Sequence, residues 1–400
     1  MTRFTGSFTQ QEPIPEEAIA AAVEVMRSGR LHRYNVAEGE VSLVSLLEEE
    51  FAASIGARYC LALASGGAAM TTALRALGVG PGDRVLTNAF TLAPVPGAIA
   101  AVGATPDYVE VTEDLVIDLD HLATKERGGV LLLSHMRGHI CNMDRLMEIA
   151  SERGLTVIED CAHTMGASWS GTPTGRFGAA GCFSTQTYKH INSGEGGFLV
   201  TDDPDLMARA VILSGSYMNY AMHRAVPERR NFEAVRLETP NVSSRMDNLR
   251  AAILRPQLRD LASQAARWNA LYAAAAEGLH GVRLPERPGK ERFVASSIQF
   301  SLPDWPGEAV AGLVNRCAVR GVQIKWFGAA EPAGFTSRYD SWRYAPVPEL
   351  PRTDTVLAGL LDMRLPLTFS VEDCRLIAEI ISEEVAKGPI PAEGPALAVQ

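Results

Sequence analysis

The chain has little of what a nucleic-acid-binding, membrane or metal protein needs. Its 37 Lys and Arg residues are outnumbered by 47 Asp and Glu residues, and the net charge of −10 disfavours nucleic acid as a partner. No apolar run approaches the length of a membrane span, and residues 1–17 lack the apolar region of a signal peptide. The six cysteines are scattered, without the short spacings of a metal site. We therefore expect a cytoplasmic protein with reduced thiols, no bound metal, no membrane contact and small-molecule partners.

The remaining composition is that of an ordinary globular protein. Hydrophobic residues make up 46% of the chain and charged residues 21%. A chain of 400 residues is long enough for two domains with sizeable cores. Short apolar runs alternate with helical patterns along the chain, which predicts an α/β fold.

The most informative stretch lies near the middle of the chain. An apolar, β-branched run at residues 155–158 predicts a buried strand, and Asp160 follows it directly. A second strand is predicted at residues 181–184, and Lys189 comes after it. The sequence Gly-Glu-Gly-Gly at residues 194–197 is too rich in glycine for a helix and suits a tight turn. Both the acid and the lysine are thus expected at strand ends, where open α/β sheets bind ligands.

One buried acid and one lysine are what pyridoxal 5'-phosphate (PLP) requires. A lysine amine holds this cofactor as a Schiff base, and a carboxylate beside the pyridine nitrogen keeps the ring protonated, so that it acts as an electron sink. We assign these two catalytic functions to Lys189 and Asp160. Singly, an aspartate at a strand end is usually a turn residue and a lysine is usually solvated, but the two in this order favour the cofactor.

A phosphate site is predicted at Ser65, Gly66 and Gly67. These residues follow an apolar strand at 59–64 and precede a helix at 68–77. Backbone N–H groups at a helix N-terminus favour an anion, and glycines allow it to approach closely. An ordinary strand–helix turn has the same pattern, so this motif alone leaves both interpretations open.

Taken together, these motifs resemble the DegT/DnrJ/EryC1/StrS family of PLP-dependent aminotransferases, which mostly act on keto-sugars. The shared residues are Glu159-Asp160, Cys182-Phe183-Ser184, Lys189 and the Gly-Glu-Gly-Gly turn, and the similarity extends from about residue 29 to residue 387. It implies a fold-type I PLP-dependent transferase with a mostly parallel sheet. It also implies a homodimer with shared active sites and glutamate or glutamine as the amino donor.

The resemblance implies further cofactor contacts, several at positions where this chain departs from the family. Ser184 corresponds to a second phosphate contact, and Ser243 replaces an Asn of the segment that reaches the phosphate in the neighbouring subunit. His163 stands where Gln is most common, and we expect it to hydrogen-bond the phenolic oxygen of PLP and to tune the cofactor through its protonation. Leu92 takes the place of an aromatic residue that stacks on the PLP ring. Either Leu92 or the nearby Phe90 is expected to cover the ring, although Phe90 and His163 would equally suit a packed core.

The expected substrate contacts are cationic and aromatic residues far apart in the sequence. The candidates are Tyr34, Arg229, Arg245, Lys325 and Trp326, with Arg338 as a further suspect. Arg229 belongs to residues 216–238, which we predict to be a long irregular loop. Such loops are often functional, and its cations suit a phosphorylated or carboxylated substrate, although a solvated loop would have the same composition.

The predicted organisation is a large PLP-binding domain at residues 1–255, a smaller C-terminal α/β domain at 256–388 and a mobile tail at 389–400. The predicted function is transfer of an amino group from glutamate or glutamine to a keto-sugar or cyclitol-type ketone, in secondary-metabolite or polysaccharide biosynthesis. The alternatives are dehydration or other carbon-bond chemistry with PLP, or a non-catalytic regulator on the same fold. The presence of both Lys189 and Asp160 favours the aminotransferase.

Overall fold

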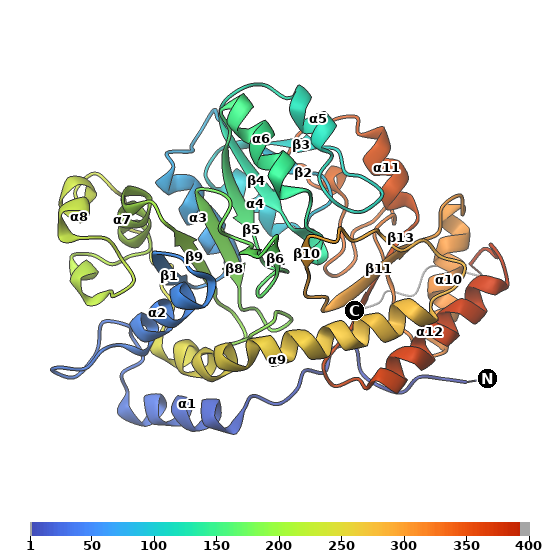
Figure 1. The fold of residues 1–400 in the computed structure, drawn as a ribbon, viewed down its shortest axis with the longest axis horizontal. Helices are drawn as coiled ribbons and strands as arrows, with labels where there is room; N and C mark the ends of the chain where they lie inside the picture. The colour runs from blue at the N-terminus through green and yellow to red at the C-terminus, as the bar shows by residue number, and fades with distance from the viewer. Residues whose placement is uncertain (1, 393–400) are drawn as a thin grey trace.

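The computed structural model describes residues 2–392 (Figure 1). Its central element is a seven-stranded sheet in the order β1-β9-β8-β5-β4-β2-β3. The strands are β1 (Tyr59–Leu63), β2 (Arg84–Asn88), β3 (Thr105–Val109), β4 (Val130–Ser134), β5 (Thr156–Asp160), β8 (Ala180–Ser184) and β9 (Gly197–Thr201). In this sheet β9 runs antiparallel to both of its neighbours, and the other strands are parallel to one another. The expected mostly parallel sheet is confirmed.

Helices cover both faces of this sheet, and its strands are therefore apolar on both sides. In β4, Leu132 packs with α3 (Gly66–Ala76), α4 (Pro94–Ala101) and α7 (Pro204–Leu213), which lie on one face. Its neighbours Leu131 and Leu133 point the other way, toward α5 (Leu119–Thr124) and α6 (Met143–Arg153). The continuous apolar run in this strand is thus explained by two separate cores.

A 31-residue helix, α9 (Asn248–Gly278), connects the two halves of the molecule. It runs beneath the large sheet and continues to the C-terminal helices, as Figure 1 shows. Its first half packs with α1 (Glu16–Ser28) and α2 (Leu43–Ile55), and its second half packs with α12 (Val371–Ala386). The helix is continuous through Pro256, where we had placed the domain boundary.

The C-terminal half contains a second, smaller sheet. Its strands are β11 (Ser297–Ser301), β12 (Lys325–Trp326) and β13 (Leu360–Arg364), in the order β11-β13-β12 and all antiparallel. The helices α10 (Gly307–Val319) and α12 pack with this sheet around an apolar core. Phe4 and Phe8 belong to the same core, so the start of the chain packs with the C-terminal unit rather than with the large sheet.

The loops and edges are formed by shorter elements. They are β6 (Ser168–Trp169), β7 (Thr172–Pro173), β10 (Glu291–Arg292), α8 (Arg229–Val235), α11 (Pro351–Ala358) and the 3-10 turns at Met136–Gly138, Asn219–Met222 and Tyr339–Ser341. Residues 216–238 were predicted to be irregular, which is wrong in part because α8 and one of these turns lie within them. Phe232 of α8 stacks on Tyr220 with ring centroids 4.5 Å apart, and both rings belong to the apolar core on the α7 side of the large sheet.

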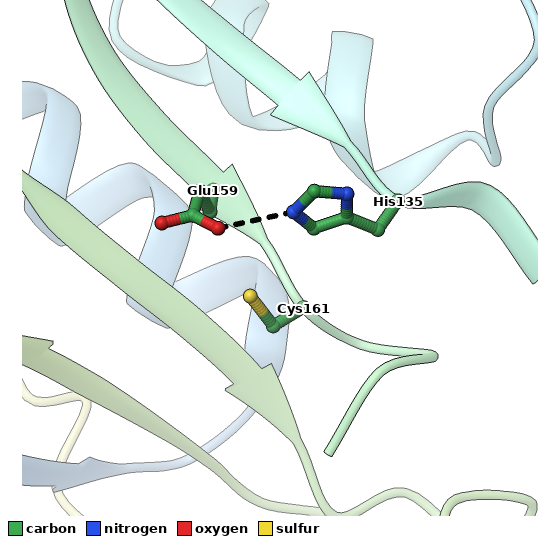
Figure 2. Close-up of side chains that lie close together, drawn as sticks. All are labelled: His135, Glu159 and Cys161. Carbon is green, nitrogen blue, oxygen red and sulfur yellow. Dashed lines mark hydrogen bonds and ion pairs between the residues drawn. The ribbon is translucent and has the colours of Figure 1, made fainter. Parts of the chain in front are cut away.

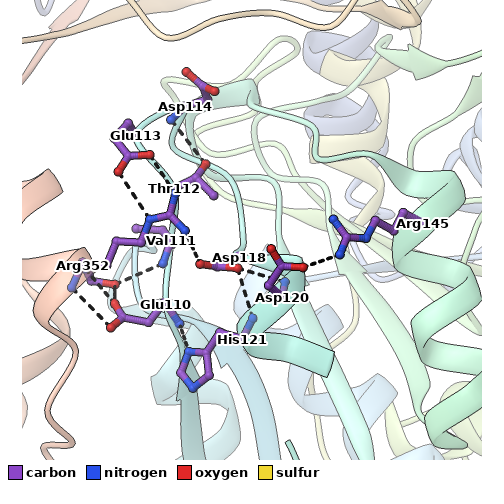
Figure 3. Close-up of polar contacts among 11 residues, drawn as sticks. Glu110, Val111, Thr112, Glu113, Asp114, Asp118, Asp120, His121, Arg145 and Arg352 are labelled. Carbon is purple, nitrogen blue, oxygen red and sulfur yellow. Dashed lines mark hydrogen bonds and ion pairs between the residues drawn. The ribbon is translucent and has the colours of Figure 1, made fainter. Parts of the chain in front are cut away.

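The N-terminus of α11 attaches the C-terminal half to the edge of the large sheet (Figure 3). Arg352 forms ion pairs with Glu113 and Asp118, and Thr353 donates its backbone N–H to Glu110 Oε2 over 2.7 Å. Asp118 also caps α5. The two halves are therefore joined on this side by a polar network, in addition to the helix α9.

Two further expectations concern the end of the chain and the membrane. Of the predicted mobile tail, residues 389–392 are described, and the backbone N–H of Ala392 donates to the carbonyl of Glu308 in α10. Residues 393–400 lie outside the described part of the chain. Among the helices of residues 2–392, none is both long and apolar enough to cross a membrane.

Candidate active site

The topology of the large sheet brings the predicted catalytic residues to one edge. The parallel strands β1, β2, β4, β5 and β8 all end there, and the antiparallel β9 begins there. Asp160 is the last residue of β5, and Lys189 lies in the loop that follows β8, the neighbouring strand. Two residues that are separated in the sequence therefore meet because their strands pair in parallel.

Asp160 is held by two short-range hydrogen bonds. Ser134, at the end of the adjacent β4, donates its hydroxyl to Oδ2 over 2.9 Å, and the backbone N–H of Ala162 donates to Oδ1 over 3.1 Å. The side chain is 6% exposed, and burial raises the pKa of the carboxyl above its ordinary value. A cationic group placed beside this carboxylate would favour its ionised form. The site therefore suits a protonated ring nitrogen.

Lys189 faces His163, with 2.8 Å between Nζ and Nε2. The backbone N–H of Arg137 donates to the other imidazole nitrogen, Nδ1, over 3.3 Å. A neutral imidazole that accepts at Nδ1 carries its proton on Nε2 and donates it, so Nζ of Lys189 must accept with a free electron pair. Burial first, and then the guanidinium of Arg137, lower the pKa of Lys189 to about 7. The lysine is thus poised as a neutral amine.

The same geometry corrects one expectation about His163. Burial lowers the pKa of this imidazole well below its ordinary value, and the positive charges of Lys189 and Arg137 lower it further. The side chain therefore stays neutral around pH 7 in this structure, which disfavours tuning of a cofactor by its protonation. What His163 offers is a hydrogen bond directed at Lys189.

The predicted phosphate site forms a tight cradle at the same edge. Ser65 caps α3 by accepting the N–H of Ala68 over 3.0 Å, and the first turn of such a helix leaves backbone N–H groups without intrahelical partners. A Cβ added to Gly66 would lie 2.9 Å from Cβ of Ser184, closer than real Cβ atoms come. Gly67 has more room, with Oγ of Ser65 at 3.7 Å from an added Cβ. The donor groups and the bare backbone fit a phosphate.

The structure separates the two candidates for covering a cofactor ring. Phe90 is 1% exposed and packs edge-on against Phe327, with ring centroids 5.1 Å apart. Leu92 instead lines the cavity next to Lys189. Phe90 is therefore a core residue, and Leu92 is the one that faces the cavity.

Several residues around this cavity were missed by sequence reasoning. The main ones are Ser134, Arg137, Tyr188, Phe335 and Arg364. Arg137 lies in a loop that the family places near the cofactor, so its cationic side chain was a signal that we passed over. Arg364 sits at the end of the last strand of the small sheet, and nothing in the local sequence distinguishes it from a surface arginine.

Of the predicted substrate residues, Lys325 lies near the candidate site, whereas Trp326 packs elsewhere. Lys325 lines a second cavity that shares Tyr188, Phe335 and Arg364 with the first. Trp326 donates its indole N–H to the carbonyl of Ala358 over 2.8 Å and packs against the small core.

The other candidates do not line the cavity of their own chain among the described residues. The hydroxyl of Tyr34 lies 2.7 Å from Nε2 of His223, next to the buried ion pair of Arg33 and Glu48. Arg229 forms an exposed ion pair with Glu233 in α8. Ser243 is exposed, and Arg245 donates to the carbonyl of Gly215 over 2.6 Å. Arg338 is held by Asp340 and Asp354.

One buried cluster near the site has the side chains of a metal centre, namely His135, Glu159 and Cys161 (Figure 2). Glu159 accepts from His135 over 3.1 Å and from the backbone N–H groups of Gly175, Phe177 and Gly178. Those bonds occupy its lone pairs. Glu159 therefore fixes the turn at residues 175–178 to the end of β5 through hydrogen bonds, and we interpret the cluster as a structural one rather than a metal site.

Comparison with known proteins agrees with this geometry. Residues 13–382 match the DegT/DnrJ/EryC1/StrS aminotransferase family. The chain belongs to this family. Its fold is accordingly that of the fold-type I enzymes, as the mostly parallel sheet and the smaller C-terminal α/β unit indicate.

The names of individual relatives refer to polysaccharide biosynthesis, a cyclitol or an amino sugar. The spore coat polysaccharide biosynthesis protein SpsC of Bacillus subtilis is 33% identical over 62% of both chains. The L-glutamine:scyllo-inosose aminotransferase of Streptomyces griseus is 36% identical over 49% of this chain and 47% of the relative. The dTDP-3-amino-3,4,6-trideoxy-alpha-D-glucose transaminase of Streptomyces venezuelae is 35% identical over 68% of this chain and 69% of the relative. The first two of these matches thus span less than two thirds of the relative.

Solved structures resemble nearly the whole chain. 3-Amino-5-hydroxybenzoic acid synthase superposes with a TM-score of 0.80 at 24% identity, covering 97% of this chain and all of that one. DesV of S. venezuelae superposes with a TM-score of 0.76 at 28% identity, covering 92% and 94% of the two chains. These likenesses support the fold on which the site was built.

Proposed function

We propose that this protein is a PLP-dependent aminotransferase that moves an amino group from an amino acid to a ketone of the sugar or cyclitol type. The observation that carries the proposal is that Lys189, a buried amine whose pKa is lowered to about 7, lies at the same sheet edge as the buried carboxyl of Asp160 and interacts with it electrostatically. Family membership supports the same reaction.

The residues that would hold the cofactor come from separate elements of this edge. Lys189 would bind it covalently, Asp160 would pair with the ring nitrogen, and His163 would donate to the phenolic oxygen. Ser65, Gly66, Gly67 and Ser184 would bind the phosphate, and Leu92 would cover the ring. The backbone N–H groups at the start of α3 and the side-chain-free backbone of Gly66 fit the phosphate assignments.

When bound, PLP supplies an electron sink for the carbanion that forms at the substrate carbon. Lys189 would do the proton transfer: its Nζ would take the proton from the α-carbon of the amino donor and deliver it to the cofactor carbon that receives the amino group. With the ketone acceptor the same Nζ would move a proton in the opposite direction. A general base works best when its pKa lies near the working pH, and burial together with Arg137 brings the pKa of Lys189 to about 7. In the structure, the hydrogen bond with His163 holds Nζ at the cavity.

We further propose glutamate or glutamine as the donor, a cytoplasmic location, and a homodimer in which each subunit completes the other's site. Support for the dimer comes from three residues that were predicted to contact the cofactor phosphate or the substrate but that do not line their own chain's cavity among the described residues. They are Ser243, predicted at the phosphate, and Tyr34 and Arg245, predicted at the substrate. A test is complementation. A mixture of Lys189→Ala and Arg245→Ala subunits, each inactive alone, should recover about a quarter of the activity if sites are shared, and none if they are not.

The function is tested by the absorption spectrum of the purified protein. A visible band that L-glutamate bleaches, with borohydride fixing the cofactor to Lys189 in the peptide map, is the expected result. Lys189→Ala should lose the covalent adduct. Asp160→Asn should keep the adduct but lose most of the transfer rate, because the ring nitrogen loses its counter-charge. A band that no amino donor changes would favour the other PLP chemistries, and no band with added PLP would refute the enzymatic proposal.

A further inference from the structure

The cavities beside Lys189 contain more positive charge than a neutral sugar ketone needs. The cationic side chains that line them are Arg137, Arg364 and Lys325. Among the described residues that line the two cavities, Asp362 is the one carboxylate. Buried cations without counter-charges are costly, so an excess of this kind indicates a ligand that supplies the missing negative charge.

Arg137 is held firmly toward the cavity. Its backbone has a φ of 56°, which is unfavourable for any residue other than glycine. Backbone strain of this kind is concentrated at functional sites. Its Nη2 lies 2.8 Å from Oδ2 of Asp362, while Oδ1 of Asp362 accepts from Gln299 over 2.7 Å. His139 in turn contacts Gln299 over 2.8 Å. Asp362, positioned by this hydrogen bond from Gln299, is thus already engaged as the ion-pair partner of Arg137.

The other two cations are left without a carboxylate of their own. The guanidinium carbon of Arg364 lies 3.4 Å from the ring centroid of Tyr188, so an aromatic face is its closest partner. Nζ of Lys325 is buried without a hydrogen-bond partner in the described structure and lies 5.4 Å from the ring centroid of Phe335. Burial lowers the pKa of Lys325 to about 8, which agrees with an ammonium that lacks an anion.

We propose that Arg137, Arg364 and Lys325 form a carboxylate-binding site used by both substrates, so that the amino acceptor is a ketone with a carboxylate close to its carbonyl. This inference rests on the proposed function, since it assumes that the donor and the acceptor occupy the same site in turn. The donor brings an α-carboxylate next to its reacting carbon. A neutral acceptor would leave the same cations without a counter-charge.

The position of the cluster separates a carboxylate from the diphosphate of a nucleotide-linked sugar. Arg137 and Arg364 line the same cavity as Lys189, and their charges act on its pKa directly. The anion they bind must therefore lie within a few bonds of the carbon that Lys189 serves. A diphosphate is separated from a ring ketone by the sugar itself and would lie farther out.

The test uses the holoenzyme and compares charged ketones with uncharged ones. After conversion to the aminated form with L-glutamate, single-turnover rates are measured with pyruvate against pyruvamide, with dihydroxyacetone phosphate against dihydroxyacetone, and with neutral scyllo-inosose. Pyruvate should react about 10- to 100-fold faster than pyruvamide, the range for one hydrogen-bonded charge. Arg364→Gln should remove most of that advantage and Lys325→Met part of it. Arg375→Gln, on the exposed side of α12, is the matched control.

The donor arm compares L-glutamate with 4-aminobutyrate, which lacks the α-carboxylate. If Arg364→Gln slows only the glutamate half-reaction while scyllo-inosose is accepted as well as pyruvate, the site serves the donor alone and the acceptor assignment is overturned. Preference for dihydroxyacetone phosphate over pyruvate overturns the choice of carboxylate. Equal losses with charged and neutral ketones in Arg364→Gln overturn the site.

A binding measurement keeps this inference distinct from the proposed function. Malonate, an unreactive carboxylate, should bind the holoenzyme in a calorimetric titration and bind at least tenfold more weakly to Arg364→Gln, with Arg375→Gln unchanged. If no amino transfer occurs but this pattern is found, the anion site stands and the proposed function falls. If malonate does not bind the unaltered protein, the anion site is refuted.

Discussion

Removal of the Lys189 ammonium should stabilise the cofactor-free protein in a pH-dependent way. Burial and Arg137 lower the pKa of Lys189 from 10.5 to about 7 in the folded chain. Between these two values the unfolded chain binds a proton that the folded chain does not, so stability rises with pH across this interval. Each pH unit contributes about 1.4 kcal/mol, and the whole interval on the order of 5 kcal/mol.

The variant Lys189→Met keeps the length of the side chain and removes the charge. At pH 7 it should be more stable than the unaltered protein, and the difference should shrink toward zero as the pH approaches 10.5. The assay is urea unfolding of cofactor-free protein at half-unit pH steps. The protein concentration is held fixed, because the stability of the proposed dimer would depend on it. Lys290→Met, at an exposed lysine paired with Asp144, is the matched control.

Two results would refute this reasoning about Lys189. Parallel stability curves for Lys189→Met and the unaltered protein between pH 7 and 10.5 would mean that the lysine titrates alike in both states. A Lys189→Met protein that is less stable at pH 7 would mean that the ammonium is favourably paired in the fold. Either result would remove the physical basis for Lys189 as a neutral base.

Three further changes test other parts of the structure. Gly66→Ala should weaken PLP binding about tenfold in a fluorescence titration, because its Cβ would meet Ser184 at 2.9 Å, and Gly67→Ala should do less; equal effects would count against the cradle. His163→Gln should leave the pH midpoint of the visible band in place, since a neutral imidazole is exchanged for a neutral amide; a shift beyond one pH unit would restore a titrating His163. Glu48→Gln should cost about 3–5 kcal/mol in urea unfolding at pH 7, because it leaves the buried Arg33 without its bidentate partner, and a loss below about 1 kcal/mol would contradict that pairing.

Much of the fold and the positions of the two proposed catalytic residues could be predicted from local pattern. Apolar runs separated by helical segments predict parallel strands buried on both faces, and Asp160 and Lys189 each follow such a run directly. Parallel pairing then places both at one sheet edge without any knowledge of the side-chain packing. The phosphate site at Ser65, Gly66 and Gly67 could be proposed for the same reason, because the junction between a strand end and a helix start is a local feature of the sequence.

Other assignments failed or stayed open because they depend on contacts between distant elements. Whether Phe90 or Leu92 faces the cavity is decided by Phe327, which arrives from the C-terminal half and takes Phe90 into the core. The charge of His163 is decided by its burial beside Lys189 and Arg137. A residue's exposure and its charged neighbours are not encoded in its local sequence.

The sequence by itself determined which chemistry this protein can perform, because the order of strand, acid, strand, lysine and glycine turn leaves little freedom for where Asp160 and Lys189 lie. Only the tertiary structure decided what surrounds them. Arg137, Lys325 and Arg364 come from a loop of the large sheet and two strands of the small one, and each alone resembles a solvated cation. Folding buries them in shared cavities with one carboxylate, Asp362, and this imbalance of charge exists only once the two halves have packed together.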